Sequence, residues 1–169
     1  YYGPDTHINM NWTEGFSCRR QAAISVGMFP EGSPEPLVAG EDGWFGDRLE
    51  AAGCRRVFDR SIVVGHLMPS ELGEFFKQRI GRGHGTAQIW FQRDGITRFD
   101  LAYRAFKQSL FFLVSIGLVA PVVRHGWVFA RYSTLRWADW IPFAFATVLQ
   151  SFANVVGIWR GLLEAFNES

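Results

Sequence analysis

The longest uncharged run of the sequence lies near its C-terminal end and limits what the chain can fold into. Residues 140–159 are twenty residues without an acidic or basic side chain, and Gln150 and Asn154 are their most polar members. A helix of about 20 apolar residues matches the hydrocarbon thickness of a bilayer. The run therefore predicts a membrane-spanning helix, and a soluble protein with an unusually apolar core is the alternative.

A second run, 109–123, contains fifteen uncharged and mostly apolar residues between Lys107 and Arg124. It is slightly short for a span, although tilt or a local adjustment of the bilayer accommodates such a length. The two runs together predict a hairpin of two spans with both ends on the cytoplasmic side. Arg124, Arg131 and Arg136 in the connecting loop oppose the positive-inside rule. Re-entrant or interface-lying helices therefore stay open.

The segment 86–106 mixes aromatic side chains with arginines. It contains Trp90, Phe91, Phe99, Tyr103 and Phe106 beside Arg93, Arg98 and Arg104. A helix that carries aromatic residues on one side and arginines on the other lies in the membrane interface. We therefore expect an amphipathic helix, or a pair of helices, in this segment.

Charge divides the chain as well. Residues 1–54 carry three Arg against eight acidic residues, a net charge of −5, and residues 55–107 carry ten Lys or Arg against five acidic residues, a net charge of +5. An acidic part followed by a basic neck suits an enzyme that lies against an anionic cytoplasmic leaflet. The neck has no recognisable nucleic-acid-binding motif and adjoins apolar runs, so we expect a membrane partner and no nucleic acid.

The stretch 40–53 of the acidic part places two adjacent carboxylates, Glu41 and Asp42, at the start of a short amphipathic helix. The apolar face of this helix is predicted to consist of Phe45, Leu49 and Ala52. The partly positive N–H groups at a helix N-terminus hold a carboxylate ionised, which suits a general base when a cleft desolvates it. The alternative is that the pair only caps the helix.

Four motifs follow one another between residues 10 and 90. They are Gly15-Phe16-Ser17-Cys18-Arg19-Arg20, Val26-Gly27-Met28-Phe29, the Glu41-Asp42 helix that ends in Ala52-Gly53, and Val63-Val64-Gly65-His66. In this order and spacing the sequence resembles the second half of a family 2 glycosyltransferase of the GT-A type.

The resemblance implies an α/β fold in three parts. They are the acceptor-side half of a GT-A domain over 1–88, an amphipathic interface helix or neck over 89–107, and two membrane helices over 108–169. Within the first part we expect short strands at 10–16, 56–58 and 62–64, and helices at 19–27 and 70–81. The donor-binding half of the family ends in an Asp-x-Asp that binds a divalent metal, Mg²⁺ or Mn²⁺, and this sequence contains no Asp-x-Asp.

The resemblance also assigns roles on the acceptor side. It identifies Asp42 as the base that deprotonates the acceptor hydroxyl, with Glu41 beside it in the substrate site. It places Glu14 and Gly15 in a turn that lines the acceptor side of the cleft. The alternative for this turn is a tight strand-to-helix connection without contact to substrate.

Three further residues belong to the leaving-group side. Arg79 and Arg82, next to a glycine-rich segment, resemble the family's basic region and would offer bidentate donors to a departing diphosphate. An ordinary basic patch at the membrane surface is the alternative for them. His66 follows a predicted strand end, where it either contacts the metal or the pyrophosphate, or is a packing or surface residue.

The implied function is inverting transfer of a sugar from a nucleotide-sugar donor to a lipid-linked saccharide, on the cytoplasmic face of the cell membrane, in cell-surface polysaccharide synthesis. A non-enzymatic membrane adaptor that has kept the fold without the donor half is the alternative. A metal hydrolase using Asp42, His66 and His84 is a third class, but the sequence lacks His-x-x-x-His or similar spacing.

Overall fold

The computed structural model describes residues 16–29, 36–55, 57, 64–65, 71–131, 133 and 135–167. These residues form six α-helices, one π-helical turn and one 3₁₀ turn, and none of them lies in a β-strand. Of the three segments predicted as strands, only Phe16, Val57 and Val64 are described. The chain divides into two compact units, residues 1–68 and residues 69–169, whereas the sequence-based division places its first boundary at residue 88.

The first unit contains α1 (Arg20–Ser25) and α2 (Glu41–Ala51), which confirm the helices predicted at 19–27 and after Gly40. The chain leaves α1 through Gly27, whose φ of 80° favours glycine. The Gly27 N–H donates to the Ile24 carbonyl and the Met28 N–H donates to the Ala23 carbonyl, which closes the helix end.

A small aromatic cluster holds α1 and α2 together. Phe45 and Leu49 of α2 are buried with Val26. The rings of Phe16 and Phe29 pack on Phe45 with centroid distances of 6.1 Å and 4.5 Å. The apolar face predicted for α2 is therefore confirmed at Phe45 and Leu49 but wrong at Ala52, which is exposed because the helix ends at the preceding residue.

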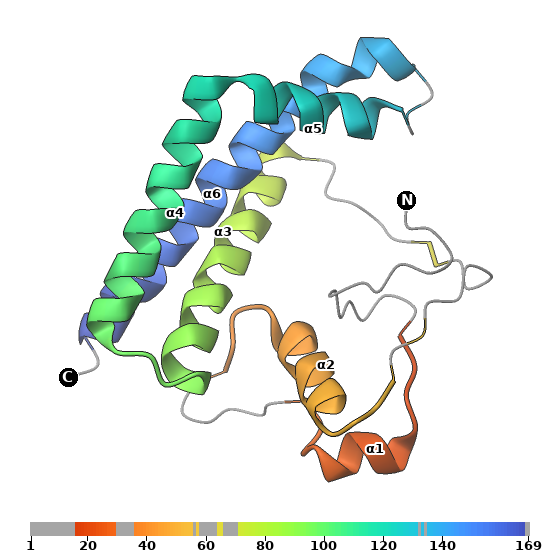
Figure 1. The fold of residues 1–169 in the computed structure, drawn as a ribbon, viewed down its shortest axis with the longest axis vertical. Coiled ribbons are helices and arrows are strands. Elements are labelled where there is room, and N and C mark those ends of the chain that lie inside the picture. Colours follow the sequence, from red (N-terminus) through yellow and green to blue (C-terminus); the bar gives the residue numbers. More distant parts are fainter. Residues whose placement is uncertain are drawn as a thin grey trace. The chain divides into compact units, whose positions relative to one another are not determined.

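The second unit is a bundle of longer helices. Its elements are α3 (Leu72–Gln88), the π-helical turn η1 (Ile89–Arg93), α4 (Arg98–Leu118), α5 (Ala120–Ala130), the 3₁₀ turn η2 (Arg136–Asp139) and α6 (Trp140–Asn167). α3, α4 and α6 lie side by side, and α6 packs against α3, α4 and α5 (Figure 1). The helical pair expected within 86–106 is present, because the chain leaves the helix between Asp94 and Thr97.

Glycines allow the backbones of α3 and α6 to touch. A Cβ added at Gly83 would lie 2.0 Å from the Asn154 carbonyl oxygen, and one at Gly157 would lie 2.1 Å from the Ile80 carbonyl oxygen. The buried small residues of α6 recur every fourth position, as Ala153, Gly157, Gly161 and Ala165. This spacing is typical of helix pairs that pack within membranes. α3 therefore extends beyond the predicted helix 70–81, because the glycines after residue 80 form this helix contact and not a loop.

Polar contacts fix α4 along α6. The Arg98 Nε–H donates to the Ala165 carbonyl oxygen at 2.8 Å, and the Trp159 indole N–H donates to Ser109 Oγ at 2.9 Å. Between these contacts, Leu101 of α4 and Leu162 of α6 are buried in the core. These contacts therefore hold the first half of α4 against the C-terminal half of α6.

The apolar run 109–123 does not form one straight helix. α4 and α5 meet at an angle of 80° at Val119, which has a φ of 56°, and Pro121 follows in the first turn of α5. Proline fits the first turn of a helix but not the interior of a continuous one. The two apolar runs of the predicted hairpin therefore lie in α6 and in a bent α4–α5 pair.

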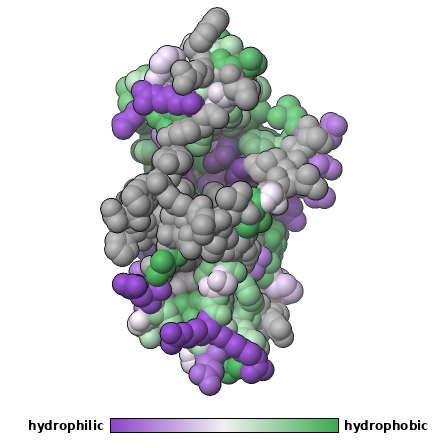
Figure 2. All heavy atoms as spheres, turned by 90° about the vertical axis from the view of Figure 1, so that its right-hand side faces the viewer, coloured by the Kyte–Doolittle hydropathy of each residue, from purple (hydrophilic) through white to green (hydrophobic). Residues whose placement is uncertain are grey.

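The length and composition of α6 are sufficient for a membrane span, and the α4–α5 pair passes the same test when taken together. Within the most apolar 18-residue window of α6, 22% of the residues are buried inside the protein. A core helix of a soluble protein is mostly buried, so this small share favours a membrane-facing helix. Hydrophobic residues also reach the surface beside strongly hydrophilic ones on the face shown in Figure 2.

Candidate functional site

The first candidate site is the start of α2. Gly40 precedes the helix with a φ of 92°, and its carbonyl oxygen accepts the first helical hydrogen bond from the Trp44 N–H at 3.0 Å. Glu41 and Asp42 both lie in the first turn, where Glu41 is exposed and Asp42 is half-buried. The predicted pair therefore stands at the positive end of a helix.

The Asp42 carboxylate is anchored locally. Its Oδ1 atom accepts a hydrogen bond from the Gly43 N–H at 2.7 Å. The space beside Gly43 is open, because no described atom lies within 4 Å of a Cβ added there. One turn further, the Arg48 guanidinium lies 4.5 Å from the centroid of the Trp44 ring. Asp42 is thus a half-buried acceptor whose carboxylate is oriented by the neighbouring amide.

The other residues predicted for this part of the site are Glu14, Gly15 and His66, and all three lie outside the described residues. Within the ranges that the structure describes, no group of three or more His, Cys, Asp or Glu side chains could hold a metal ion. The divalent metal that the resemblance implies stays a prediction.

The second candidate site is a small polar cavity between α3 and α6. Arg79 and Arg82 of α3 line it, and its volume is about 230 Å³. The residues that α6 contributes are Gln150, Ser151 and Asn154. The structure therefore brings the two predicted arginines into one cavity and adds three neutral polar side chains to them.

Arg79 is a cation that lacks part of its solvation. Burial and, to a smaller extent, the neighbouring charge of Arg82 lower the pKa of Arg79 below its usual value. Its guanidinium lies 4.9 Å from the centroid of the Phe75 ring. The Nε atom is buried and has no hydrogen-bond partner among the described residues. An anion in this cavity would offset both the lost solvation and the repulsion between the two arginines.

The contribution of α6 to this cavity was not predicted from the sequence. Gln150, Ser151 and Asn154 are noticeable in the sequence only as polar interruptions of an apolar run. Their spacing of one and three residues places them on one side of a helix, and this is the signal that could have found them. Which helix they face depends on the pairing of α6 with α3, which the pattern does not specify.

His84, considered above as a metal ligand, has a different partner. It is buried on α3, and its Nε2 forms a hydrogen bond with Oε2 of Glu164 on α6. The second carboxylate oxygen of Glu164 accepts a hydrogen bond from the Arg160 Nε–H at 3.3 Å. His84 therefore takes part in the packing of α3 against α6.

Comparisons of the chain with family models, with curated proteins and with solved structures find no match. The functional conclusion therefore depends on the residues and on their geometry.

Proposed function

We propose that this chain provides the acceptor-activating and anion-binding parts of a membrane-associated, inverting sugar transferase of the family 2 type. The observation that carries the proposal is the position of Asp42. It stands in the first turn of α2, and its carboxylate is oriented by the Gly43 N–H. The surrounding motifs, in their order and spacing, resemble the acceptor-side half of that family.

The reaction is a single displacement. Asp42 accepts the proton of an acceptor hydroxyl, and the hydroxyl oxygen forms a bond to the anomeric carbon of a nucleotide-activated sugar. The bond from that carbon to the diphosphate oxygen breaks, and its electron pair stays on the diphosphate. The products are an inverted glycoside, a nucleoside diphosphate and a protonated Asp42. The carboxylate lies at the partly positive N-terminus of α2, and substrate binding removes the water that would weaken it as a base.

Arg79 and Arg82 are proposed to bind phosphate oxygens. Guanidinium groups offer paired donors that match phosphate oxygens, and the pKa of Arg79, lowered by burial, indicates a cation that gains from an anionic neighbour. The amide side chains of Gln150 and Asn154 add neutral donors in the same cavity. A diphosphate bound in this cavity would be stabilised by the two cations and the amide donors.

The membrane part of the proposal rests on α4, α5 and α6. The apolar length of α6 and the bent α4–α5 pair support attachment to a bilayer. We place the catalytic part on the cytoplasmic face of the cell membrane, where a lipid-linked saccharide would be the acceptor. Assembly of cell-surface polysaccharide is the process that would use such a product.

The test is sugar transfer by membranes that contain the full-length gene product. Membranes are incubated with radiolabelled nucleotide-sugars, and the label is followed into the lipid extract. Asp42→Asn should lower transfer about 100- to 10,000-fold, the usual contribution of a general base. Asp47→Asn, the same change at an exposed position of α2, is the matched control and should transfer normally.

Undiminished transfer by Asp42→Asn would remove this carboxylate from the mechanism. A wild-type protein that is present in the membrane but transfers no sugar from any donor would favour the membrane adaptor.

A further inference from the structure

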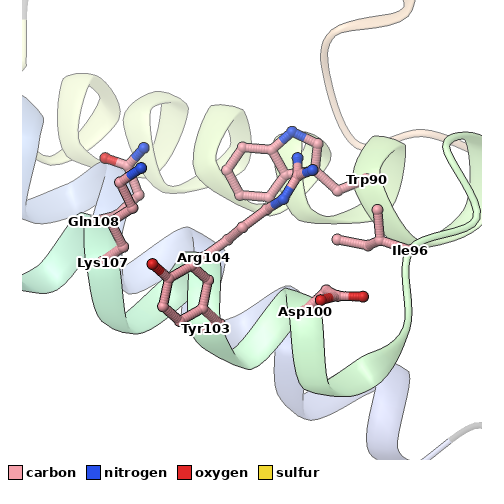
Figure 3. Close-up of a pocket in the computed structure, with 7 residues that line it drawn as sticks. All are labelled: Trp90, Ile96, Asp100, Tyr103, Arg104, Lys107 and Gln108. Carbon is pink, nitrogen blue, oxygen red and sulfur yellow. The ribbon is translucent and has the colours of Figure 1, made fainter.

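A second, larger pocket opens on α4, away from the cavity described above. Its volume is about 520 Å³. Its lining includes Trp90 from the turn after α3 and a group of polar residues from α4, namely Asp100, Tyr103, Arg104, Lys107 and Gln108 (Figure 3). The proposed sugar transfer does not use this pocket.

The pocket carries a net positive charge. The Arg104 side chain extends over the Trp90 ring, with its guanidinium carbon 5.0 Å from the ring centroid (Figure 3). Lys107 lies one turn further along the same helix and is exposed. The nearby acid, Asp100, accepts a hydrogen bond from Thr97 Oγ1 at 2.7 Å as part of the cap of α4. Two cations therefore face one carboxylate that already has a partner.

The same side of α4 becomes apolar beyond the pocket. Residues 104, 107, 111, 114 and 118 follow one another at intervals of three or four, which places them in one row along a helix. The row begins with Arg104 and Lys107 and continues with Phe111, Val114 and Leu118. Phe111 is 70% exposed and Leu118 is 64% exposed. The positively charged pocket is therefore followed along α4 by a row of exposed apolar side chains, the apolar track.

We infer that this pocket binds the phosphate group of an anionic lipid, whose hydrocarbon chain lies along Phe111, Val114 and Leu118. Arg104 and Lys107 pair with the phosphate, and the Tyr103 hydroxyl and the Gln108 amide are further donors. The Trp90 ring holds the Arg104 guanidinium in place. The positive charge favours a phosphate group, and the row of exposed apolar side chains favours a hydrocarbon chain. A lipid that carries both therefore fits this part of α4. The inference does not depend on sugar transfer.

The test uses native mass spectrometry of the detergent-purified full chain with added phosphatidylglycerol, and with phosphatidylcholine for comparison. We expect phosphatidylglycerol to bind preferentially. Each of the substitutions Arg104→Gln and Lys107→Gln should weaken its binding about fivefold, and the two together should weaken it about 25-fold. The charge-matched control is Lys77→Gln with Arg124→Gln, two exposed positions outside the pocket, and it should bind as the wild type does.

Two further experiments distinguish the binding of a lipid from the binding of other phosphate compounds. Excess inorganic phosphate should not displace phosphatidylglycerol, because inorganic phosphate lacks a hydrocarbon chain. The substitution Phe111→Asn should weaken the binding of phosphatidylglycerol while leaving the protein folded. Displacement by inorganic phosphate would show an ordinary phosphate site and would overturn the lipid assignment. An equal loss of phosphatidylglycerol binding in the control variant would show attraction by overall charge alone. It would overturn the assignment of this pocket as the binding site.

Discussion

The substitution Gly157→Ala tests the close packing of α3 against α6. The new Cβ would lie 2.1 Å from the Ile80 carbonyl oxygen, 2.7 Å from the His84 amide nitrogen and 2.9 Å from the Gly83 Cα. All three atoms belong to the backbone of a neighbouring helix, so no side chain can rotate away. To reach 3.4 Å, where ordinary van der Waals contact begins, the helices would have to separate by about 1.3 Å, the difference between 3.4 and 2.1 Å.

Such overpacking costs about 1–3 kcal/mol. Alanine gains about 1 kcal/mol over glycine in helix propensity, but the separation also loosens Ile158 and Leu162, which are buried between α6 and its neighbours. We therefore expect a net loss of about 2 kcal/mol. For a chain of this size, the corresponding decrease in Tm is about 4–8 °C.

The assay is thermal unfolding in detergent, followed by circular dichroism. The matched control is Gly117→Ala on α4, where an added Cβ meets nothing within 4 Å. It should leave Tm unchanged or raise it. A Tm for Gly157→Ala equal to or above that of the wild type would refute the close backbone contact.

Two other predictions concern the same helix pair. Glu164→Ala leaves the buried His84 ring without its partner and should cost about 1–3 kcal/mol in unfolding free energy, whereas Arg160→Gln, at an exposed pair, should cost less than about 1 kcal/mol; equal effects would contradict the burial argument. Pyrophosphate at about 100 times its Kd should stabilise the wild type by about 2.7 kcal/mol, and Arg79→Gln should abolish this Tm increase while Lys77→Gln keeps it. A Tm increase that survives in Arg79→Gln would remove Arg79 from the anion site.

Local signals in the sequence were sufficient for several elements. The start of α2 follows from two carboxylates after Gly40, and the core of α6 follows from its uncharged run. α6 nevertheless continues from Trp159 to Asn167, because the charges beyond the run do not interrupt it. Arg160 and Glu164 pair at a spacing of four, and Glu164 also reaches His84.

Other features depend on contacts that no local pattern encodes. The glycines after residue 80 favour a loop when α3 is considered alone, but they become helical because α6 requires a close approach at Gly83. The hydropathy of 109–123 is uniform, so the bend at Val119 is visible only through Pro121 and the backbone. The pair of arginines in the polar cavity, Arg79 and Arg82, could be predicted from the sequence. The α6 residues that line the same cavity could not, since the pairing of the two helices decides which side chains meet.

The direct backbone contact between α3 and α6 has a mechanical consequence. Side chains that interdigitate can slip by changing rotamers, but two main chains in contact have no such freedom. α3 must therefore follow α6 whenever α6 changes its inclination, and Arg79 moves with it. If α6 lies in a bilayer, a thicker or thinner lipid phase that reorients this helix will shift the guanidinium pair on its neighbour, so lipid thickness becomes a variable to which the polar cavity responds.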